Sequence, residues 1–321
     1  MRVFAALFLF AALQDDAVEL KFKYAPGDKE SVVMDCTLEM EVSVHAGAEK
    51  HEQKMSGPIK LTLNLNCPKE VASKSLDAEA GLTKLVASFS DPEMTQNVTM
   101  GDTTFELSVK GEKVLMKTED GKVIIDTENG VNPEAAAEII KEMAFSEKAE
   151  FQLDPRGIIK GKGSEKVKEL FGGVVGDNLF PLVLPEKAAG TGSTWQYKVL
   201  MDKLGKMKFG KAVEVPLNFK LEKFEGEGAR RVAVISLKQD VSLKNIECAG
   251  EMDGVGKAKM VIKKLSISMT GESRFNVTKG RLAKASVTGK VSGTIEVTPE
   301  AIDQTMDVHV DVTIKATMEP K

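Results

Sequence analysis

Three cysteines, Cys36, Cys67 and Cys248, are the residues of this chain best suited to nucleophilic, redox or metal chemistry. None of them belongs to a Cys-x-x-Cys pair, so their spacing indicates neither a structural zinc site nor a thioredoxin-like redox centre. Three cysteines are also too few for a disulfide scaffold. Two interpretations stay open for Cys36 and Cys67, a disulfide or two buried thiols that face each other. Cys248 is then left over, as a buried or loop thiol.

The other groups that do acid, base or metal chemistry form no recognisable motif. His45 and His309 lie on polar rows of predicted strands and His51 lies in a predicted loop, which is typical of solvated histidines. The signatures of serine hydrolases, zinc peptidases, P-loop proteins and dinucleotide-binding proteins are absent from the sequence. We therefore expect no catalytic residue, no cofactor, no metal ligand and a protein that is not an enzyme.

Two alternating segments bear on the cysteines. From Val32 to His45 the even positions are apolar or cysteine and the odd positions after Val33 are polar, which predicts a strand with one buried face. Residues 59–67 alternate in the same way on odd positions. A hairpin through the polar loop 46–58 would place Leu38 opposite Leu65 and Cys36 opposite Cys67. A disulfide there would contribute roughly 3 to 4 kcal/mol in the chain-entropy model, provided that the protein is exported.

The C-terminal end predicts a second long hairpin. Even positions are apolar over 305–318, and odd positions are apolar over 283–297, where Gly289 and Gly293 share the row. Strands of this length span about 45 Å at ~3.3 Å per residue, so the sheet must twist and curl, and the two glycines are the predicted bends. Folding about 298–304 gives the pairs Val297 with Met306, Ile295 with Val308, and Val291 with Val312.

The middle of the chain is also mostly extended in pattern. Alternation at 213–221, 233–237 and 257–270 predicts further strands, and only residues 133–143 and a segment after Ser164 have helical spacing. The expected fold class is mainly β (α+β), with long-stranded, curled antiparallel sheets like a half-barrel and about two short covering helices.

The N-terminus has the organisation of a short signal peptide. Arg2 precedes an apolar run from Val3 to Ala12, which is too short to cross a ~30 Å hydrocarbon core as a helix. A buried N-terminal strand or helix is the alternative. We expect a signal peptide at 1–14, an N-terminal antiparallel β region with two helices at 15–185, and a C-terminal long-stranded antiparallel sheet at 186–321.

Composition excludes several classes of protein. The 44 basic and 48 acidic residues leave no basic excess, so a nucleic-acid partner is not expected. A hydrophobic content of 42% and a charged content of 29% exclude a mostly disordered chain and a polytopic membrane protein. We expect no transmembrane span, and export to the periplasm, the cell envelope or the extracellular space.

Three segments carry a resemblance to a known group of proteins. They are Leu20-Lys21-Phe22-Lys23-Tyr24-Ala25-Pro26-Gly27-Asp28, Leu153-Asp154-Pro155-Arg156-Gly157-Ile158-Ile159, and residues 184–195, which read LPEKAAGTGSTW. These motifs resemble an uncharacterised family of exported bacterial β-rich proteins, although Thr191-Gly192-Ser193 stands where that family more often has Gly-Asp before the tryptophan. The resemblance implies an envelope location and no established activity. In architecture alone, the expected sheet is similar to the half-barrel of periplasmic lipoprotein carriers.

The sequence is compatible with two functions. The apolar rows are rich in methionine, a side chain that adapts to irregular apolar ligands, and a curled sheet would hold a lipid-like chain or an apolar peptide against them. Alternatively these residues fill a core, and the protein is a structural or protein-partner-binding component of the envelope. The candidate ligand face consists of Met34, Met40, Met260, Met269 and Met306, continued by Met318.

Overall fold

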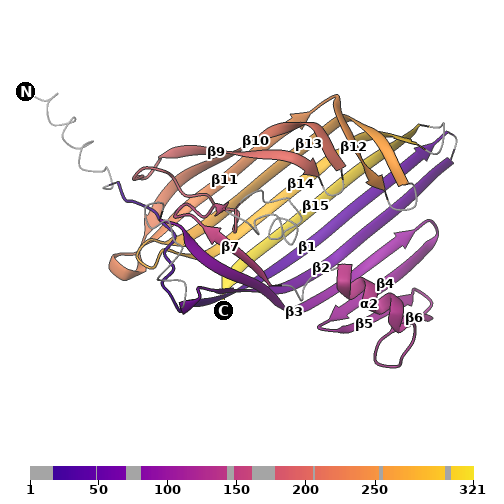
Figure 1. Ribbon diagram of the computed structural model, residues 1–321, viewed down its shortest axis with the longest axis horizontal. Coiled ribbons are helices and arrows are strands. Elements are labelled where there is room, and N and C mark those ends of the chain that lie inside the picture. The colour runs from indigo at the N-terminus through magenta and orange to yellow at the C-terminus, as the bar shows by residue number, and fades with distance from the viewer. Residues whose placement is uncertain are drawn as a thin grey trace, which may run out of the picture.

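The computed structural model describes residues 17–47, 49–69, 81–142, 148–160, 178–204, 207–252, 256–300 and 305–321. The predicted signal peptide at 1–14 and the predicted helix after Ser164 lie outside the described residues. In the described chain, fifteen strands belong to one antiparallel sheet, which confirms the mainly β class (Figure 1). The strands are β1 (Lys29–Ala46), β2 (Glu49–Asn66), β3 (Thr83–Met100), β4 (Thr103–Lys110), β5 (Lys113–Thr118), β6 (Val123–Asp126), β7 (Ala149–Leu153), β8 (Ile159–Lys160), β9 (Thr194–Leu204), β10 (Met207–Glu225), β11 (Val232–Leu243), β12 (Ile246–Met252), β13 (Gly256–Asn276), β14 (Arg281–Pro299) and β15 (Met306–Pro320).

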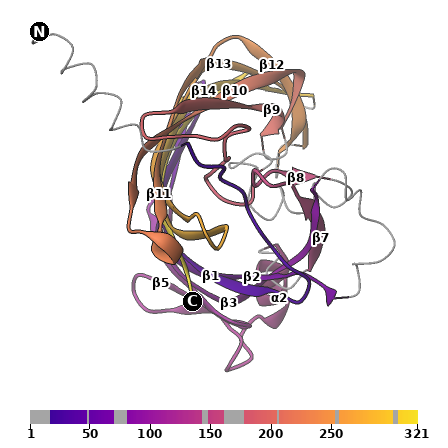
Figure 2. The same cartoon turned by 90° about the vertical axis from the view of Figure 1, so that its left-hand side faces the viewer.

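The first and last of these strands in chain order pair with each other inside the sheet. β1 lies antiparallel to β15 from Val32 opposite Pro320 to His45 opposite Asp307, so both predicted regions share one sheet. The long strands follow the order β13, β14, β15, β1, β2, β3. β11 and β12 pair end to end with β13, and β10 and β9 follow them. Figure 2 shows that this sheet curls, so that β9 and β10 lie across the interior from β1, β2 and β3.

The predicted C-terminal hairpin is confirmed in its register. Val297 lies opposite Met306, Ile295 opposite Val308 and Val291 opposite Val312. In β13, Lys263 interrupts the alternation of apolar residues, and a bulge lies there, because the pairing of β13 with β14 shifts between Ile262 and Lys264. A Cβ at Gly293 would lie 2.2 Å from the carbonyl oxygen of Lys264, so only glycine fits where the two backbones approach at this bulge.

The register predicted for the N-terminal hairpin is wrong. Leu38 lies opposite Gly57, eight residues before Leu65, because β2 begins at Glu49 and the turn at Gly47 is short. The prediction of which side chains face inward still holds, because a register shift by an even number of residues keeps each side chain on its side of the sheet. The polar residues assigned to a loop are instead the first half of a strand, which hydrogen-bonds to β1 on one side and β3 on the other.

The three motifs that carry the family resemblance meet at one end of the curled sheet. The N–H of Phe22 donates to the carbonyl of Pro155 at 2.8 Å, and Val18 exchanges backbone hydrogen bonds with Ala189. The Asp154 carboxylate accepts hydrogen bonds from two backbone N–H groups of its own turn. Arg156 reaches from that turn to the carbonyl of Leu184 at 2.9 Å. Turn chemistry in these motifs therefore joins three segments that are far apart in the sequence.

The helices of the described chain are short. The one α-helix there, α2 (Pro133–Glu142), starts with a proline followed by Glu134, as its sequence predicts, and packs against β4, β5 and β6. A 3₁₀ turn, η3 (Gly228–Arg230), joins β10 to β11. Among the described residues no helix has both the length and the apolar character needed to cross a membrane.

Candidate functional site

An apolar cavity of about 260 Å³ lies inside the curled sheet. Nine strands contribute to its wall, so residues that are far apart in the sequence meet around it. β1, β2 and β3 line one side, β9, β10 and β11 line the opposite side, and β13, β14 and β15 join the two (Figure 2). Six of the lining side chains are Met34, Leu61, Phe89, Val199, Leu217 and Met269.

Strand alternation places these side chains in the interior, and one glycine makes room for the cavity. On β14 the odd-numbered row faces inward, and Val287, Gly289 and Val291 all line the cavity. Apart from its chain neighbours, a Cβ at Gly289 would have no heavy atom within 4 Å. The missing side chain therefore leaves open space. Lys290 stands between two lining residues, but it belongs to the outward row and is exposed.

Packed cores lie at both ends of the cavity. On one side, the buried residues of segment 178–193 pack with the N-terminal segment, and Phe22 contacts Phe180 and Phe275 at ring-centroid distances of 5.9 and 5.1 Å. The indole N–H of Trp195 donates to the carbonyl of Val183 at 2.7 Å and ties this segment to β9. On the other side, a separate cluster is built around Phe209, Met260, Ile262, Val297 and Val308. The cavity thus lies between two filled regions.

Two buried amides interrupt the apolar wall. Asn178 is 1% exposed and Gln239 is 4% exposed, and both line the cavity. Neither the Asn178 amide, through its Oδ1 and Nδ2, nor the Gln239 Oε1 has a hydrogen-bond partner within the described structure. A buried polar atom without a partner costs about 1–3 kcal/mol, so these three atoms are the chemically distinct feature of the cavity.

The methionines predicted to form a ligand face are divided between the cavity and the cores. Met34 and Met269 line the cavity, together with Met318. Met260 is buried in the separate cluster beyond it, and Met306 packs against that cluster. Met40 lies further along β1, half-buried, opposite Met55 and Val312. The structure therefore brings together part of the predicted set.

The cysteines do not pair. Cys36 lies opposite Ile59, and Cys67 is eight residues further along the chain, next to the turn at Gly27. At ~3.3 Å per residue this separation is far beyond the reach of a disulfide, and Cys36, Cys67 and Cys248 are all free thiols, so the predicted disulfide is wrong. Burial, with a smaller contribution from Asp35, raises the pKa of Cys36 to about 11. This thiol lines the cavity as a neutral, weakly nucleophilic group.

A polar cluster anchors the N-terminal segment beside β14. The Tyr24 hydroxyl donates to the Glu30 carboxylate at 2.7 Å, and the Arg281 guanidinium lies 3.6 Å from the centroid of the Tyr24 ring and binds Asp28 at 2.5 Å. Burial raises the pKa of both Tyr24 and Glu30 above their ordinary values. Each member of the cluster has a partner, so its arrangement is that of a structural anchor.

The predicted surface histidines are separate from the cavity. His45 and His309 lie on adjacent strands with ring centroids 5.1 Å apart, and Thr294 contacts the Nδ1 of His309 at 3.0 Å. His51 is exposed near Glu49. Across the described ranges, no three histidine, cysteine, aspartate or glutamate residues are grouped as metal ligands would be.

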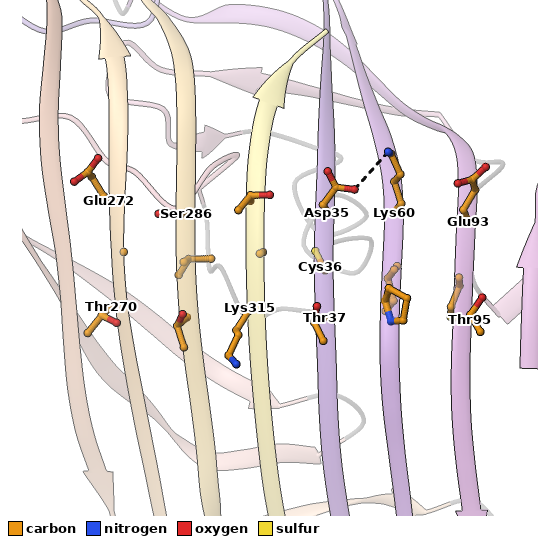
Figure 3. Close-up of a pocket in the computed structure, with 18 residues that line it drawn as sticks. Asp35, Cys36, Thr37, Lys60, Glu93, Thr95, Thr270, Glu272, Ser286 and Lys315 are labelled. Carbon is orange, nitrogen blue, oxygen red and sulfur yellow. Dashed lines mark ion pairs between the residues drawn. The ribbon is translucent and has the colours of Figure 1, made fainter. Parts of the chain in front are cut away.

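A larger hollow of about 830 Å³ is a shallow groove across the outer face of the sheet (Figure 3). The groove is lined by side chains of the outward rows of the strands. On β1, for example, Asp35 and Thr37 belong to the outward row and Cys36 between them faces inward. Lys60 binds Asp35 at 3.7 Å, and Glu93 follows on the next strand. Exposed charges that alternate in sign across neighbouring strands are typical of a solvated sheet face, so the inner cavity is the better candidate site.

Comparisons with known proteins give no family for this chain. No family model and no curated protein matches it. Among solved structures, Pseudomonas aeruginosa OccK11 (OpdR) aligns over 96% of this chain and 100% of its own, with 9% identity and a TM-score of 0.18. The P. putida toluene transporter TodX aligns over 93% and 90%, with 8% identity and a TM-score of 0.16. MucB, in complex with MucA(peri), aligns over 87% and 88%, with 10% identity and a TM-score of 0.10. These TM-scores are too low to indicate a shared fold.

The two buried amides were not identified from the sequence. A signal for Gln239 was present, because it is the one polar residue in the inward row Ala233, Ile235, Leu237, Gln239 and Val241. Asn178 belongs to no strand of the described chain and forms an isolated bridge with Ile158, so its position had no periodic signal in the sequence.

Proposed function

We propose that this protein is an exported, non-catalytic cell-envelope protein that binds an apolar or lipid-like ligand in the cavity of its curled sheet. The observation that carries the proposal is the apolar cavity of about 260 Å³ between two packed cores. A ligand that fills the cavity removes apolar surface from water, both its own and that of the wall, which favours binding by about 25 cal/mol per Å².

The size and chemistry of the cavity define the ligand class. One water takes about 30 Å³ of liquid volume, so the space suits on the order of ten non-hydrogen atoms, a short alkyl chain or the end of a longer one. Methionines in the wall adapt to such a flexible chain. The raised pKa of Cys36 supports binding over covalent catalysis, because the thiol, and not the thiolate, faces the ligand. A basic residue followed by a short apolar run within residues 1–14, as in a signal peptide, supports export.

The proposal is tested with n-butylbenzene, an apolar molecule of suitable size, by isothermal titration calorimetry on delipidated protein. We expect saturable binding with a negative heat-capacity change, as for burial of apolar surface. Gly289→Met fills the open space and should weaken binding at least tenfold. Ser292→Met places the same side chain on the exposed, outward row of the same strand and should leave binding unchanged.

Native mass spectrometry of protein purified from its own host gives the second readout. We expect a bound apolar molecule that is lost on delipidation, together with a fall in stability. A measured mass equal to that of the polypeptide alone, together with no calorimetric binding to the wild type, would contradict the proposal. That result would favour the alternative of a structural or partner-binding envelope component.

A further inference from the structure

The polar atoms of the cavity wall define what the ligand must carry besides its apolar part. Asn178 presents both an acceptor oxygen and a donor NH₂ without a partner, and Gln239 presents an acceptor oxygen without one, within the described part of the chain. Because an amide side chain both donates and accepts, it matches a group that does the same. Water molecules would also satisfy these atoms, and the experiment below separates the two cases.

The charge of the wall decides between a neutral and an ionised group. Among the described residues that line the cavity there is no carboxylate, and the one charged residue, Lys290, belongs to the exposed outward row of β14. An ionised carboxylate or phosphate would find no inward-facing counter-charge among these described residues, and burying an unpaired charge is far more costly than burying a neutral polar group. A hydroxyl, an ester or an amide avoids that cost.

We propose, on the basis of the function proposed above, that the ligand is a neutral amphiphile whose hydrogen-bonding head group binds Asn178 and Gln239 while its alkyl part fills the apolar remainder of the cavity. The two amides lie on different parts of the chain, Gln239 on β11 and Asn178 in the described segment 178–193 before β9, so one head group joins these two parts of the wall.

The experiment compares octan-1-ol, octanoate and n-butylbenzene by calorimetry at pH 8. In the wild type we expect octan-1-ol to bind at least tenfold more tightly than octanoate. Shorter alcohols should lose about fourfold in affinity for each CH₂ removed, since a buried CH₂ is worth ≈ 0.8 kcal/mol. This comparison needs no substitution and so does not depend on the folding of a variant.

Two matched variants assign the effect to the amide. Gln239→Leu should weaken octan-1-ol binding about three- to tenfold and leave n-butylbenzene within twofold of the wild type. Gln96→Leu makes the same change at another buried glutamine with an unpartnered Oε1, which does not line the cavity, and should alter neither affinity.

The outcomes separate this inference from the proposed function. If n-butylbenzene binds but octanoate binds as tightly as octan-1-ol, or Gln239→Leu keeps the wild-type affinity for octan-1-ol, water satisfies the amides and the inference is overturned while the proposed function stands. If none of the three ligands binds, the proposed function itself fails.

Discussion

Replacing Gln239 by leucine should stabilise the ligand-free protein. Gln239 is 4% exposed, and its Oε1 finds no hydrogen-bond partner in the described chain, a deficit that costs about 1–3 kcal/mol. Leucine is close to glutamine in size, adds no polar atom and loses less side-chain entropy on burial, by about 1 kcal/mol. We expect the free energy of unfolding to rise by about 2 kcal/mol.

Urea unfolding of delipidated protein measures this change. Trp195, the single tryptophan of the chain, stacks on Phe219 at a centroid distance of 5.7 Å and reports loss of the core through its fluorescence. The midpoint should move to higher urea with an unchanged slope, since the surface exposed on unfolding stays the same.

Gln96→Leu is the control for this prediction. The Nε2 of Gln96 donates to the carbonyl of Pro58 at 3.4 Å, so the substitution removes one weak hydrogen bond as well as one unpartnered oxygen, and its gain should be smaller. A loss of 1 kcal/mol or more in Gln239→Leu would refute the reasoning, because it would mean that the glutamine has a stabilising partner in the native state. A gain, in contrast, is expected of a polar group kept for binding at the expense of stability.

Three further predictions test the fold and the clusters around the cavity. Gly293→Ala should lower the free energy of unfolding by about 1–3 kcal/mol, whereas Gly289→Ala should change it by less than about 0.5 kcal/mol, and equal effects in urea unfolding would contradict the close backbone approach. Thiol titration of unreduced protein in denaturant should find 3 free thiols, and a count of one would show that a disulfide is present. In the native state at pH 8, Cys36 should react slowly because burial raises its pKa. Because burial raises the folded-state pKa of Glu30, the stability linked to its proton is present below its ordinary pKa and is lost as the pH rises through the raised value. Glu30→Gln should therefore gain stability relative to the wild type as the pH rises above the ordinary carboxyl pKa, and a relative loss over that rise would show that the pKa is lowered.

Part of the fold could be predicted because side chains two apart share a face of a strand. Alternation identified the long strands at both ends of the chain, and in the C-terminal hairpin the apolar rows continue up to a short connection, so the register followed. In the N-terminal hairpin the polar first half of β2 hid the strand, and the face pattern alone accepts any even shift. The predicted disulfide depended on that register, so it was wrong for the same reason.

The sequence by itself determined which residues belong to the interior, since periodicity is a local property of each strand. It marked Met34, Met269 and Met318 as inward-facing and left their separation in space undefined. Only the tertiary structure decided which of them surround a cavity, because the curl of the sheet brings β9 and β10 across from β1, β2 and β3. It also decided that Asn178 and Gln239 share that space, since hydrogen bonds between segments far apart in the sequence, which no local pattern predicts, fix the position of residues 178–193.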